Sequence, residues 1–205
     1  MTIKVGDKLP ETTFMTMTAE GPKPATTAEV FGGKKVALFA VPGAYTPTCH
    51  KTHAPGFVAR AAELKAKGYA TVACTSTNDI FVLSEWSKDI GADGKFLMLA
   101  DGSGEFAKKI GLEFDLSARG LGIRSRRYAM AIDNGVVKVL SVEEGAAVEK
   151  SSAETLCSLI DRALRISISR AAGRLSPAQP ELHDASIAQA ALDRDLGRDS
   201  CRNVI

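Results

Sequence analysis

The stretch "KKVALFAVPGAYTPTCHKTHAPGF" (residues 34–57) decides the fold. Its first part, residues 34–41, is a short apolar run typical of a buried β-strand. Thr46 is then placed to cap a helix, because Pro47 follows it at the first helical position, where a fixed φ and a missing N–H cost nothing. A buried strand followed at once by a helix is the unit from which α/β folds are built.

The rest of the chain continues this alternation. We expect the first helix to end at Gly68, a residue suited to a helix C-terminus, and to kink or break at Pro55-Gly56. A hairpin is expected at 127–142, where two alternating runs meet at Asn134-Gly135, a pair suited to a type I′ turn. The other expected elements are strands at 34–41, 69–77 and 96–100, helices at 78–91 and 104–111, and a helix at 151–164 opened by a Ser151-x-x-Glu154 capping box.

This order of elements predicts an α/β fold with a central mixed β-sheet flanked by helices. One domain is expected over residues 1–165. Residues 166–205 differ in composition, because lysine is absent while arginine continues, and they are expected to form a C-terminal extension, partly helical or disordered. Within that extension, 176–184 is linker-like and 185–197 has the spacing of an amphipathic helix.

Composition excludes several classes of function. The chain has 205 residues, 45% hydrophobic residues and a net charge of +2, which is an ordinary globular composition. Basic residues are scattered and aromatic residues make up only 6%, so no nucleic-acid partner is expected. The N-terminus carries no apolar segment and no run of 18 apolar residues occurs, so we expect no membrane span and a cytoplasmic location.

The four cysteines, Cys49, Cys74, Cys157 and Cys201, form no CxxC pair and no zinc-type spacing. Cys74 lies in a predicted strand and is interpreted as a core residue, with a resolving thiol as the alternative. Cys157 is interpreted as a core residue of the last helix, and Cys201 as a tail thiol without a role. Cys49 and His53 share one helix face, but no second cluster supplies further ligands, so no metal site is expected.

Cys49 is the exceptional thiol, because it falls at about the third residue of the predicted helix. Backbone N–H groups there lack intrahelical partners, and they favour a thiolate together with the helix dipole. Lowering a thiol pKa from about 8.5 to about 6 needs about 3.4 kcal/mol, whereas the dipole supplies about 0.3–2 kcal/mol. A second positive group is therefore expected. The sequence leaves it open among Arg119, Arg124, Arg126, Arg127, Lys51, His50 and His53.

His53 lies one turn after Cys49 on the same helix face, and it is interpreted either as a base or as a packing residue.

Four segments together carry a family resemblance. "VPGAYTPTCHKTHAPGF", "LKAKGYATVACTSTNDIFVLSEW", "LMLADGSGEF" and "RRYAMAIDNGVVKVLSVE" resemble the type II (atypical, peroxiredoxin-five-like) peroxiredoxins of the AhpC/TSA-redoxin superfamily, over about residues 3–160. The resemblance implies a thioredoxin-like fold and a peroxidase that reduces hydrogen peroxide and alkyl hydroperoxides without a metal or an organic cofactor. It also implies a homodimer and a role in cell redox homeostasis.

The resemblance also implies site residues. Cys49 matches the peroxidatic cysteine, which attacks the peroxide and becomes a sulfenic acid, and Thr46 matches the threonine whose hydroxyl bonds the thiolate and the peroxide. Arg127 matches the active-site arginine, which resolves the choice left open above. Pro42 matches the proline that shields the thiolate from bulk water.

The chain departs from the animal branch of the family, which carries a resolving cysteine near positions 150–152, where this sequence has Lys-Ser-Ser. It resembles the plant and bacterial branch, in which a second cysteine matches Cys74. Glutaredoxin with glutathione, or thioredoxin, is the reductant that this branch implies.

Two other functions use the same thiol. A peroxide sensor or holdase would be oxidised once without turnover, so steady-state turnover with a reductant separates it from a peroxidase. A disulfide oxidoreductase on the same fold is disfavoured by the absence of CxxC.

Overall fold

The structure is a computed structural model that describes residues 1–145 and 147–174. Two compact units are distinguished, Met1–Ser167 and Ile168–Ile205, and the sheet and the candidate site belong to the first. The predicted linker 176–184, the predicted helix 185–197 and Cys201 lie outside the described residues. The proposed division into 1–165 and 166–205 stays a prediction.

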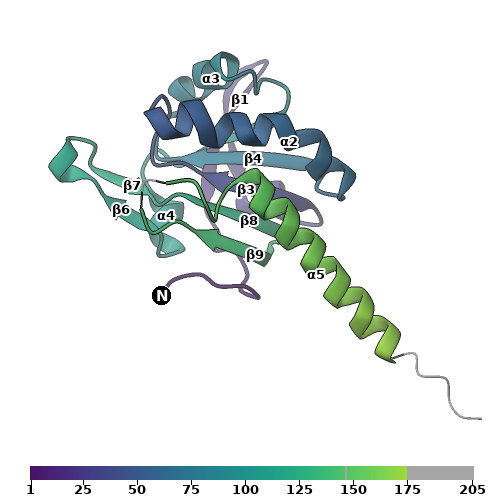
Figure 1. The fold of residues 1–205 in the computed structure, drawn as a ribbon. Helices are drawn as coiled ribbons and strands as arrows, with labels where there is room; N and C mark the ends of the chain where they lie inside the picture. The colour runs from purple at the N-terminus through teal and green to yellow at the C-terminus, as the bar shows by residue number, and fades with distance from the viewer. Residues whose placement is uncertain (146, 175–205) are drawn as a thin grey trace, which may run out of the picture. The chain divides into compact units, whose positions relative to one another are not determined.

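A seven-stranded mixed sheet forms the centre of the first unit (Figure 1). Its strand order is β2-β1-β5-β4-β3-β8-β9, in which β3, β4 and β5 are parallel and the other neighbours pair antiparallel. This confirms the predicted mixed sheet with an antiparallel closing hairpin. The strands are β1 Thr13–Thr18, β2 Gly21–Thr26, β3 Lys35–Ala40, β4 Thr71–Ser76, β5 Phe96–Ala100, β8 Tyr128–Asp133 and β9 Val136–Val142.

Helices cover both faces of the sheet. One apolar cluster packs residues of α2, α3 and α5 against one face, and a second packs residues of α1 and α4 against the other. Figure 1 shows α2 running alongside β4. The helices are α1 Thr27–Phe31, α2 Ala54–Ala66, α3 Ile80–Asp89, α4 Glu105–Lys109 and α5 Ala153–Arg174, with a π-helical turn η1 at Cys49–His53 and a 3-10 turn η2 at Ser117–Arg119. A separate small sheet pairs β6 Glu113–Asp115 with β7 Ile123–Ser125.

The predicted hairpin is confirmed at β8–β9. Asn134 and Gly135 have φ values of 49° and 73°, the pair of positive angles that a type I′ turn requires. The N-terminal hairpin β1–β2, in contrast, was not predicted, and its second strand contains Pro22 and Pro24, a residue type unfavourable in strands. Since β2 is the edge strand of the sheet, its prolines remove no interior ladder hydrogen bond.

The start of α5 differs by one residue from the prediction. Ser152, not Ser151, caps the helix, because its hydroxyl oxygen accepts a hydrogen bond from the Thr155 N–H at 3.1 Å. The Ser151 side chain turns inward instead and donates to Glu143. The helix also continues beyond the expected end at residue 164, to Arg174.

The predicted break at Pro55-Gly56 is also wrong, because the irregularity lies one turn earlier. Cys49–His53 form a π-helical turn, in which the Ala54 N–H bonds the Cys49 carbonyl, and Pro55 lies in the first turn of α2. A proline removes one helix hydrogen bond and its ring clashes with the carbonyl four residues earlier, and a wider turn ahead of it relieves that clash.

The expected C-terminus of this helix is confirmed, since Gly68 has a φ of 89° just after α2.

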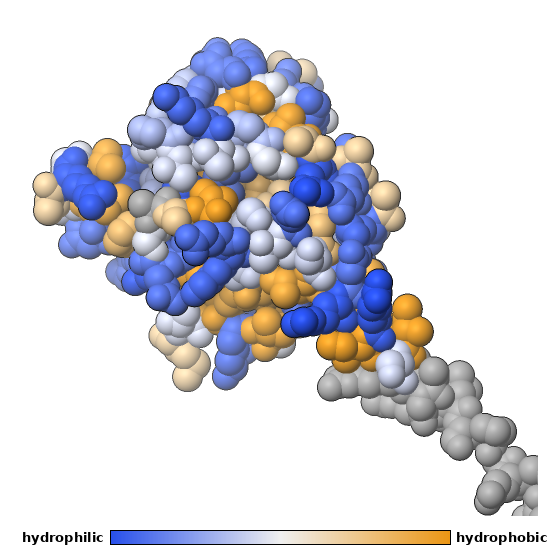
Figure 2. Space-filling view, viewed as in Figure 1, coloured by the Kyte–Doolittle hydropathy of each residue, from blue (hydrophilic) through white to orange (hydrophobic). Residues whose placement is uncertain are grey.

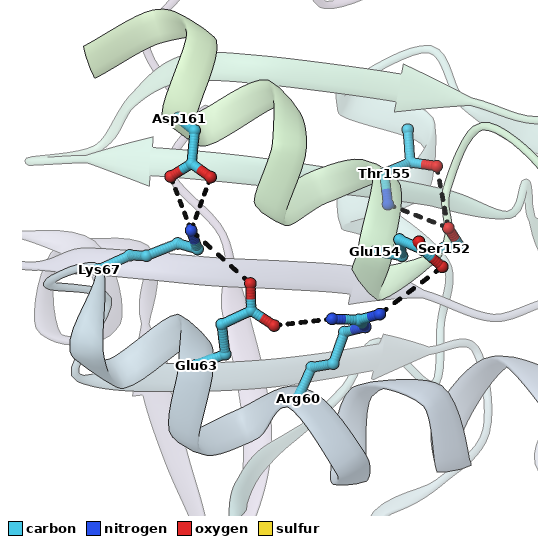
Figure 3. A network of polar contacts seen from close by, with 7 residues as sticks. All are labelled: Arg60, Glu63, Lys67, Ser152, Glu154, Thr155 and Asp161. Atoms are coloured by element: carbon cyan, nitrogen blue, oxygen red, sulfur yellow. Dashed lines mark hydrogen bonds and ion pairs between the residues drawn. The ribbon is translucent and has the colours of Figure 1, made fainter. Parts of the chain in front are cut away.

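A polar network joins α2 to the first turns of α5 (Figure 3). Lys67 reaches across to Asp161, with Nζ 2.6 Å from Oδ1, and is also 3.6 Å from Glu63. Arg60 pairs with Glu63 at 2.8 Å and with Glu154 at 3.6 Å. These contacts lie at the rim of the apolar cluster that holds α5, so they fix the register of α5 against α2 rather than supply most of its stability.

Further along α5 the side chains become exposed. Leu164 and Ile166 are 39% and 46% exposed. Figure 2 shows apolar side chains on this helix and over β9, among a mostly mixed surface. Within the described residues, none of the helices is both long and apolar enough to cross a membrane.

Candidate active site

The loop between β3 and η1 is fixed by hydrogen bonds to the end of β4. The Val41 N–H bonds the Thr75 carbonyl at 3.1 Å, and the Ala44 N–H bonds Asn78 Oδ1 at 2.9 Å. Asn78 Oδ1 also accepts from the Ser76 hydroxyl at 2.8 Å, which fixes its orientation. The loop that precedes the thiol is therefore a rigid element.

Gly43 lets this loop pack closely. A Cβ on Gly43 would lie 3.1 Å from Thr46 Cγ2 and 3.4 Å from NH1 of Arg124. Arg124 itself donates to the carbonyls of Leu121, at 2.6 Å, and Pro42, at 3.4 Å. The carbonyl of the half-buried Pro42 thus links this loop to the β6–β7 hairpin.

Thr46 is half-buried and lies just before the helical residues that begin at Pro47. Its hydroxyl donates to the Gly43 carbonyl at 2.8 Å, whereas the predicted helix cap requires the hydroxyl oxygen to accept from a backbone N–H. The helix start is confirmed, since the His50 N–H bonds the Thr46 carbonyl at 2.9 Å. The Thr46 oxygen keeps lone pairs for a further partner, because its proton is used on Gly43.

Cys49 is the third residue of this helical run and the first of η1. Its side chain is fully buried and belongs to the apolar cluster that also contains Phe39 and Phe57. The first N–H groups of the helical run have no intrahelical acceptor. The thiol is thus enclosed in an apolar wall, with backbone donors at the start of its own helix.

His53 ends the same π-helical turn, and it is fully buried with both ring nitrogens engaged. NH1 of Arg127 lies 3.2 Å from Nδ1, and the Ser151 carbonyl lies 2.9 Å from Nε2. Because a guanidinium only donates, Nδ1 accepts and Nε2 carries the proton. Burial, with a smaller contribution from Arg127, lowers the pKa of His53 to about 4. His53 is therefore a neutral residue that holds Arg127, and it is not available as a base.

Arg127 immediately precedes β8 and is only 5% exposed. One of its nitrogens bonds His53, while Nε has no hydrogen-bond partner among the described residues. A buried guanidinium N–H without an acceptor is costly, and proteins satisfy such a group with an ordered water or a polar ligand atom. Arg127 thus brings a positive charge to the turn that begins at Cys49.

The other cationic candidates are exposed or have other contacts. Arg124 bonds loop carbonyls, and Arg126 lies over the Phe114 ring at 5.8 Å. His50 accepts a hydrogen bond from Trp86 Nε1 at 3.1 Å. Arg119 and Lys51 are exposed.

Cys74 and Cys157 are both buried core residues. Cys74 lies in β4 between Phe39 and Met98 of the neighbouring strands, and burial, with a smaller effect of Cys49, raises its pKa. Burial and then Glu63 raise the pKa of Cys157 to about 11. Both thiols are therefore protonated near neutral pH. The described residues contain no group of three or more His, Cys, Asp or Glu placed to hold a metal ion.

The comparisons with known proteins agree with this geometry. The Redoxin family model matches residues 4–157, which is most of the chain. The chain belongs to the peroxiredoxin family. It is 51% identical over 158 residues to peroxiredoxin-2E, chloroplastic, of Arabidopsis thaliana, covering 75% of this chain and 68% of that one.

Solved peroxiredoxins have the same fold. Prx3 of Vibrio vulnificus, in a structure with hydrogen peroxide, is 47% identical and superposes with a TM-score of 0.74, over 77% of this chain and 99% of that one. Peroxiredoxin 5 of Alvinella pompejana is 35% identical, with a TM-score of 0.69 over 78% and 99%. The thioredoxin-like fold and the type II resemblance are confirmed, and the chain is a thiol-dependent peroxidase with a role in redox chemistry.

Sequence reasoning missed three residues of this candidate site: Asn78, Glu143 and Ser151. Asn78 positions the loop, and the other two belong to the surroundings of His53. The only signal for Asn78 is that it follows a predicted strand. Nothing in the sequence indicates a site role for Glu143 or for Ser151, which was predicted only as a helix cap, because their contacts join segments that are far apart in the chain.

Proposed function

We propose that this peroxiredoxin reduces hydrogen peroxide and alkyl hydroperoxides at Cys49 and is regenerated by an external thiol, from glutaredoxin with glutathione or from thioredoxin. The observation that carries the proposal is the contact of Arg127 with His53, in the helical turn that begins at Cys49, together with an Arg127 Nε that has no partner among the described residues. Donors beside a nucleophile are what O–O cleavage requires, because negative charge develops on the departing oxygen.

The first step is a displacement at oxygen. The Cys49 thiolate attacks the terminal peroxide oxygen, so that an S–O bond forms and the O–O bond breaks. The departing oxygen takes a proton and leaves as water or alcohol, and Cys49 becomes a sulfenic acid. Arg127 and Thr46 are proposed to hold the two peroxide oxygens in line, and Pro42 to limit the access of water.

The second step returns Cys49 to the thiol. A reductant thiolate attacks the sulfenic sulfur, an S–S bond forms and water leaves. A second reductant thiol then attacks the mixed disulfide, releasing Cys49 as a thiol and the reductant as a disulfide. An external reductant is favoured because Cys74 and Cys157 are buried and protonated.

A turnover assay with a matched pair of variants tests the proposal. Wild-type protein, Cys49→Ser and Cys74→Ser are each supplied with hydrogen peroxide and either the glutaredoxin or the thioredoxin system. Cys49→Ser should lose turnover and Cys74→Ser should keep most of it. If wild-type protein stops after one equivalent of peroxide with both systems, the chain is a sensor or holdase instead.

Mass spectrometry after one equivalent of peroxide tests the role of Cys74. A sulfenic acid at Cys49 alone supports external reduction, and a Cys49–Cys74 disulfide supports the alternative in which Cys74 is the resolving thiol. The second outcome requires β4 to open locally, because Cys74 is fully buried in the centre of the sheet.

A homodimer is also part of the proposal. Large side chains are exposed in the loop before Cys49 and in the segments whose residues bond it: Tyr45 in the loop itself, Phe81 near the start of α3, and Leu121 and Ile123 in the β6–β7 region. Exposed apolar side chains gathered from neighbouring segments favour an interface between copies. Sedimentation of wild-type protein and Phe81→Glu tests it, since the variant should sediment as a monomer.

A cytoplasmic location stays a prediction. The relative from Arabidopsis thaliana is named as chloroplastic. Imaging of the tagged chain in its own cells decides between the cytosol and an organelle.

A further inference from the structure

A buried carboxylate lies behind the candidate site, away from the reacting sulfur. Glu143 follows β9 and is only 6% exposed. Its Oε1 accepts hydrogen bonds from the Ser151 N–H at 2.7 Å, the Ser151 hydroxyl at 2.9 Å and the Glu149 N–H at 2.8 Å. No cation pairs with it among the described residues.

These contacts close a ring that returns to the active-site arginine. Ser151 is fully buried, and its carbonyl lies 2.9 Å from Nε2 of His53, whose Nδ1 accepts from Arg127. The ring closes through the backbone, because the Glu143 N–H bonds the Arg127 carbonyl at 2.9 Å. One residue thus holds both the main chain of Arg127 and the segment that orients the histidine.

We propose that Glu143 is a positioning residue for Arg127 and acts through Ser151 and His53. The carboxylate fixes the Ser151 carbonyl, the carbonyl fixes the ring orientation and tautomer of His53, and Nδ1 of His53 fixes one side of the guanidinium. Glu143, Ser151 and His53 thus set the direction of the unpartnered Nε of Arg127, and none of the three is proposed to contact peroxide. This inference rests on the proposed peroxidase function of Cys49 and Arg127.

The chemistry of the donors explains why an acceptor is needed. All three groups that bond Oε1 are donors, so only an acceptor fits there. Burial raises the pKa of Glu143, but the Ser151 and Glu149 amides and the Ser151 hydroxyl more than offset this, so the pKa lies below its ordinary value. The group stays ionised at neutral pH. In a Glu143→Gln variant, the side-chain NH₂ would face the Ser151 N–H and hydroxyl in one of the two amide orientations, and donors would then face donors.

The next residue in the chain provides a matched control. Glu144 is 88% exposed at its side chain, and its carboxylate pairs with Lys150 on the surface at 2.8 Å. Glu143→Gln and Glu144→Gln remove the same charge one residue apart, so a difference between them reports the buried contacts. Two readouts are compared: the pH dependence of Cys49 alkylation by iodoacetamide, followed by peptide mass spectrometry, and kcat/KM for hydrogen peroxide.

For Glu143→Gln we expect the pH midpoint of alkylation to rise by about one unit, because a displaced guanidinium stabilises the thiolate less. The value of kcat/KM should fall about tenfold, since small displacements of positioning groups cost large factors in rate. Glu144→Gln should change neither. Adding Glu143→Gln to His53→Ala should produce no further change, because the alanine already removes the contact through which Glu143 acts.

An unchanged alkylation midpoint would overturn the inference, measured with either of two variants. If Glu143→Gln lowers only the melting temperature and leaves both readouts unchanged, Glu143 stabilises the packing of its segment and does not position Arg127. If Glu143→Gln does not fold, Ser151→Ala replaces it, because that variant loses only the hydroxyl and keeps the backbone contacts. A smaller shift of the alkylation midpoint in the same direction supports the inference, and an unchanged midpoint overturns it.

Failure of the proposed function gives a different result. A wild-type protein without turnover removes the peroxidase proposal, whereas the alkylation comparison uses no peroxide and still measures the placement of Arg127.

Discussion

Nδ1 of His53 accepts a hydrogen bond from NH1 of Arg127 at 3.2 Å, and this contact joins the π-helical turn of Cys49 to the start of β8. The two residues are 74 positions apart in the sequence. His53 lies edge-on to Phe39 and Phe57, with ring centroids 5.3 and 5.4 Å away, so its ring has no room to turn. The arginine is therefore held by a packed side chain.

Replacing His53 by alanine should remove the acceptor that holds Arg127. We expect kcat/KM for hydrogen peroxide to fall by about tenfold or more, because the guanidinium is no longer directed. Stopped-flow reaction with peroxide measures this. His53→Gln, whose side-chain oxygen accepts a hydrogen bond, should recover part of the rate, and equal rates for the two variants would contradict the positioning role.

The buried histidine should make stability depend on pH. The pKa of His53 is about 4 in the folded chain and about 6.5 when unfolded, so the unfolded chain binds more protons between these values. Its contribution to stability is complete above about pH 6.5 and is lost as the pH falls toward 4. We expect the free energy of unfolding to decrease by about 2 kcal/mol from pH 7 to pH 5. Urea titrations measure it, and His53→Gln should flatten the dependence.

Asn78→Ala should loosen the loop before Cys49. The Ala44 N–H and the Ser76 hydroxyl both lose their acceptor, and a buried donor left unpaired costs about 1–3 kcal/mol. Urea denaturation measures the loss, and turnover should fall with it because Thr46 belongs to the same loop. Ser76→Ala removes one of the two contacts and leaves the loop bond, so it should retain turnover. Equal activity of Asn78→Ala and wild-type protein would contradict this prediction.

The α2–α5 network should contribute to stability without affecting the chemistry. Asp161→Asn weakens the ion pair with Lys67, whose side chain is only 18% exposed, and we expect a loss of up to about 1 kcal/mol. Glu85→Gln weakens a fully surface-exposed pair with Lys88 and should cost less. Thermal unfolding compares the two variants. A loss of peroxide turnover in Asp161→Asn would show that the register of α5 also affects the site.

Local patterns predicted much of the fold. Asn134-Gly135 predicted the hairpin, because only residues that tolerate positive φ fit its turn. Pro47 predicted the helix start before Cys49. The errors lie where tertiary position overrides a local rule. Strand β2 tolerates two prolines because it lies at an edge of the sheet, and Ser151 does not cap α5 because its hydroxyl donates to Glu143.

The sequence by itself determined the strands and helices from β3 to α4, the β8–β9 hairpin, the helix that follows it and the place of Cys49 near a helix start. Turn residues, helix caps and apolar runs act over a few positions, so they can be read along the chain. Only the tertiary structure decided that His53 is a neutral acceptor, that it holds Arg127, and that Glu143 and Ser151 lie behind it. Those properties depend on which groups are brought together and kept from water, and sequence spacing carries no information about either.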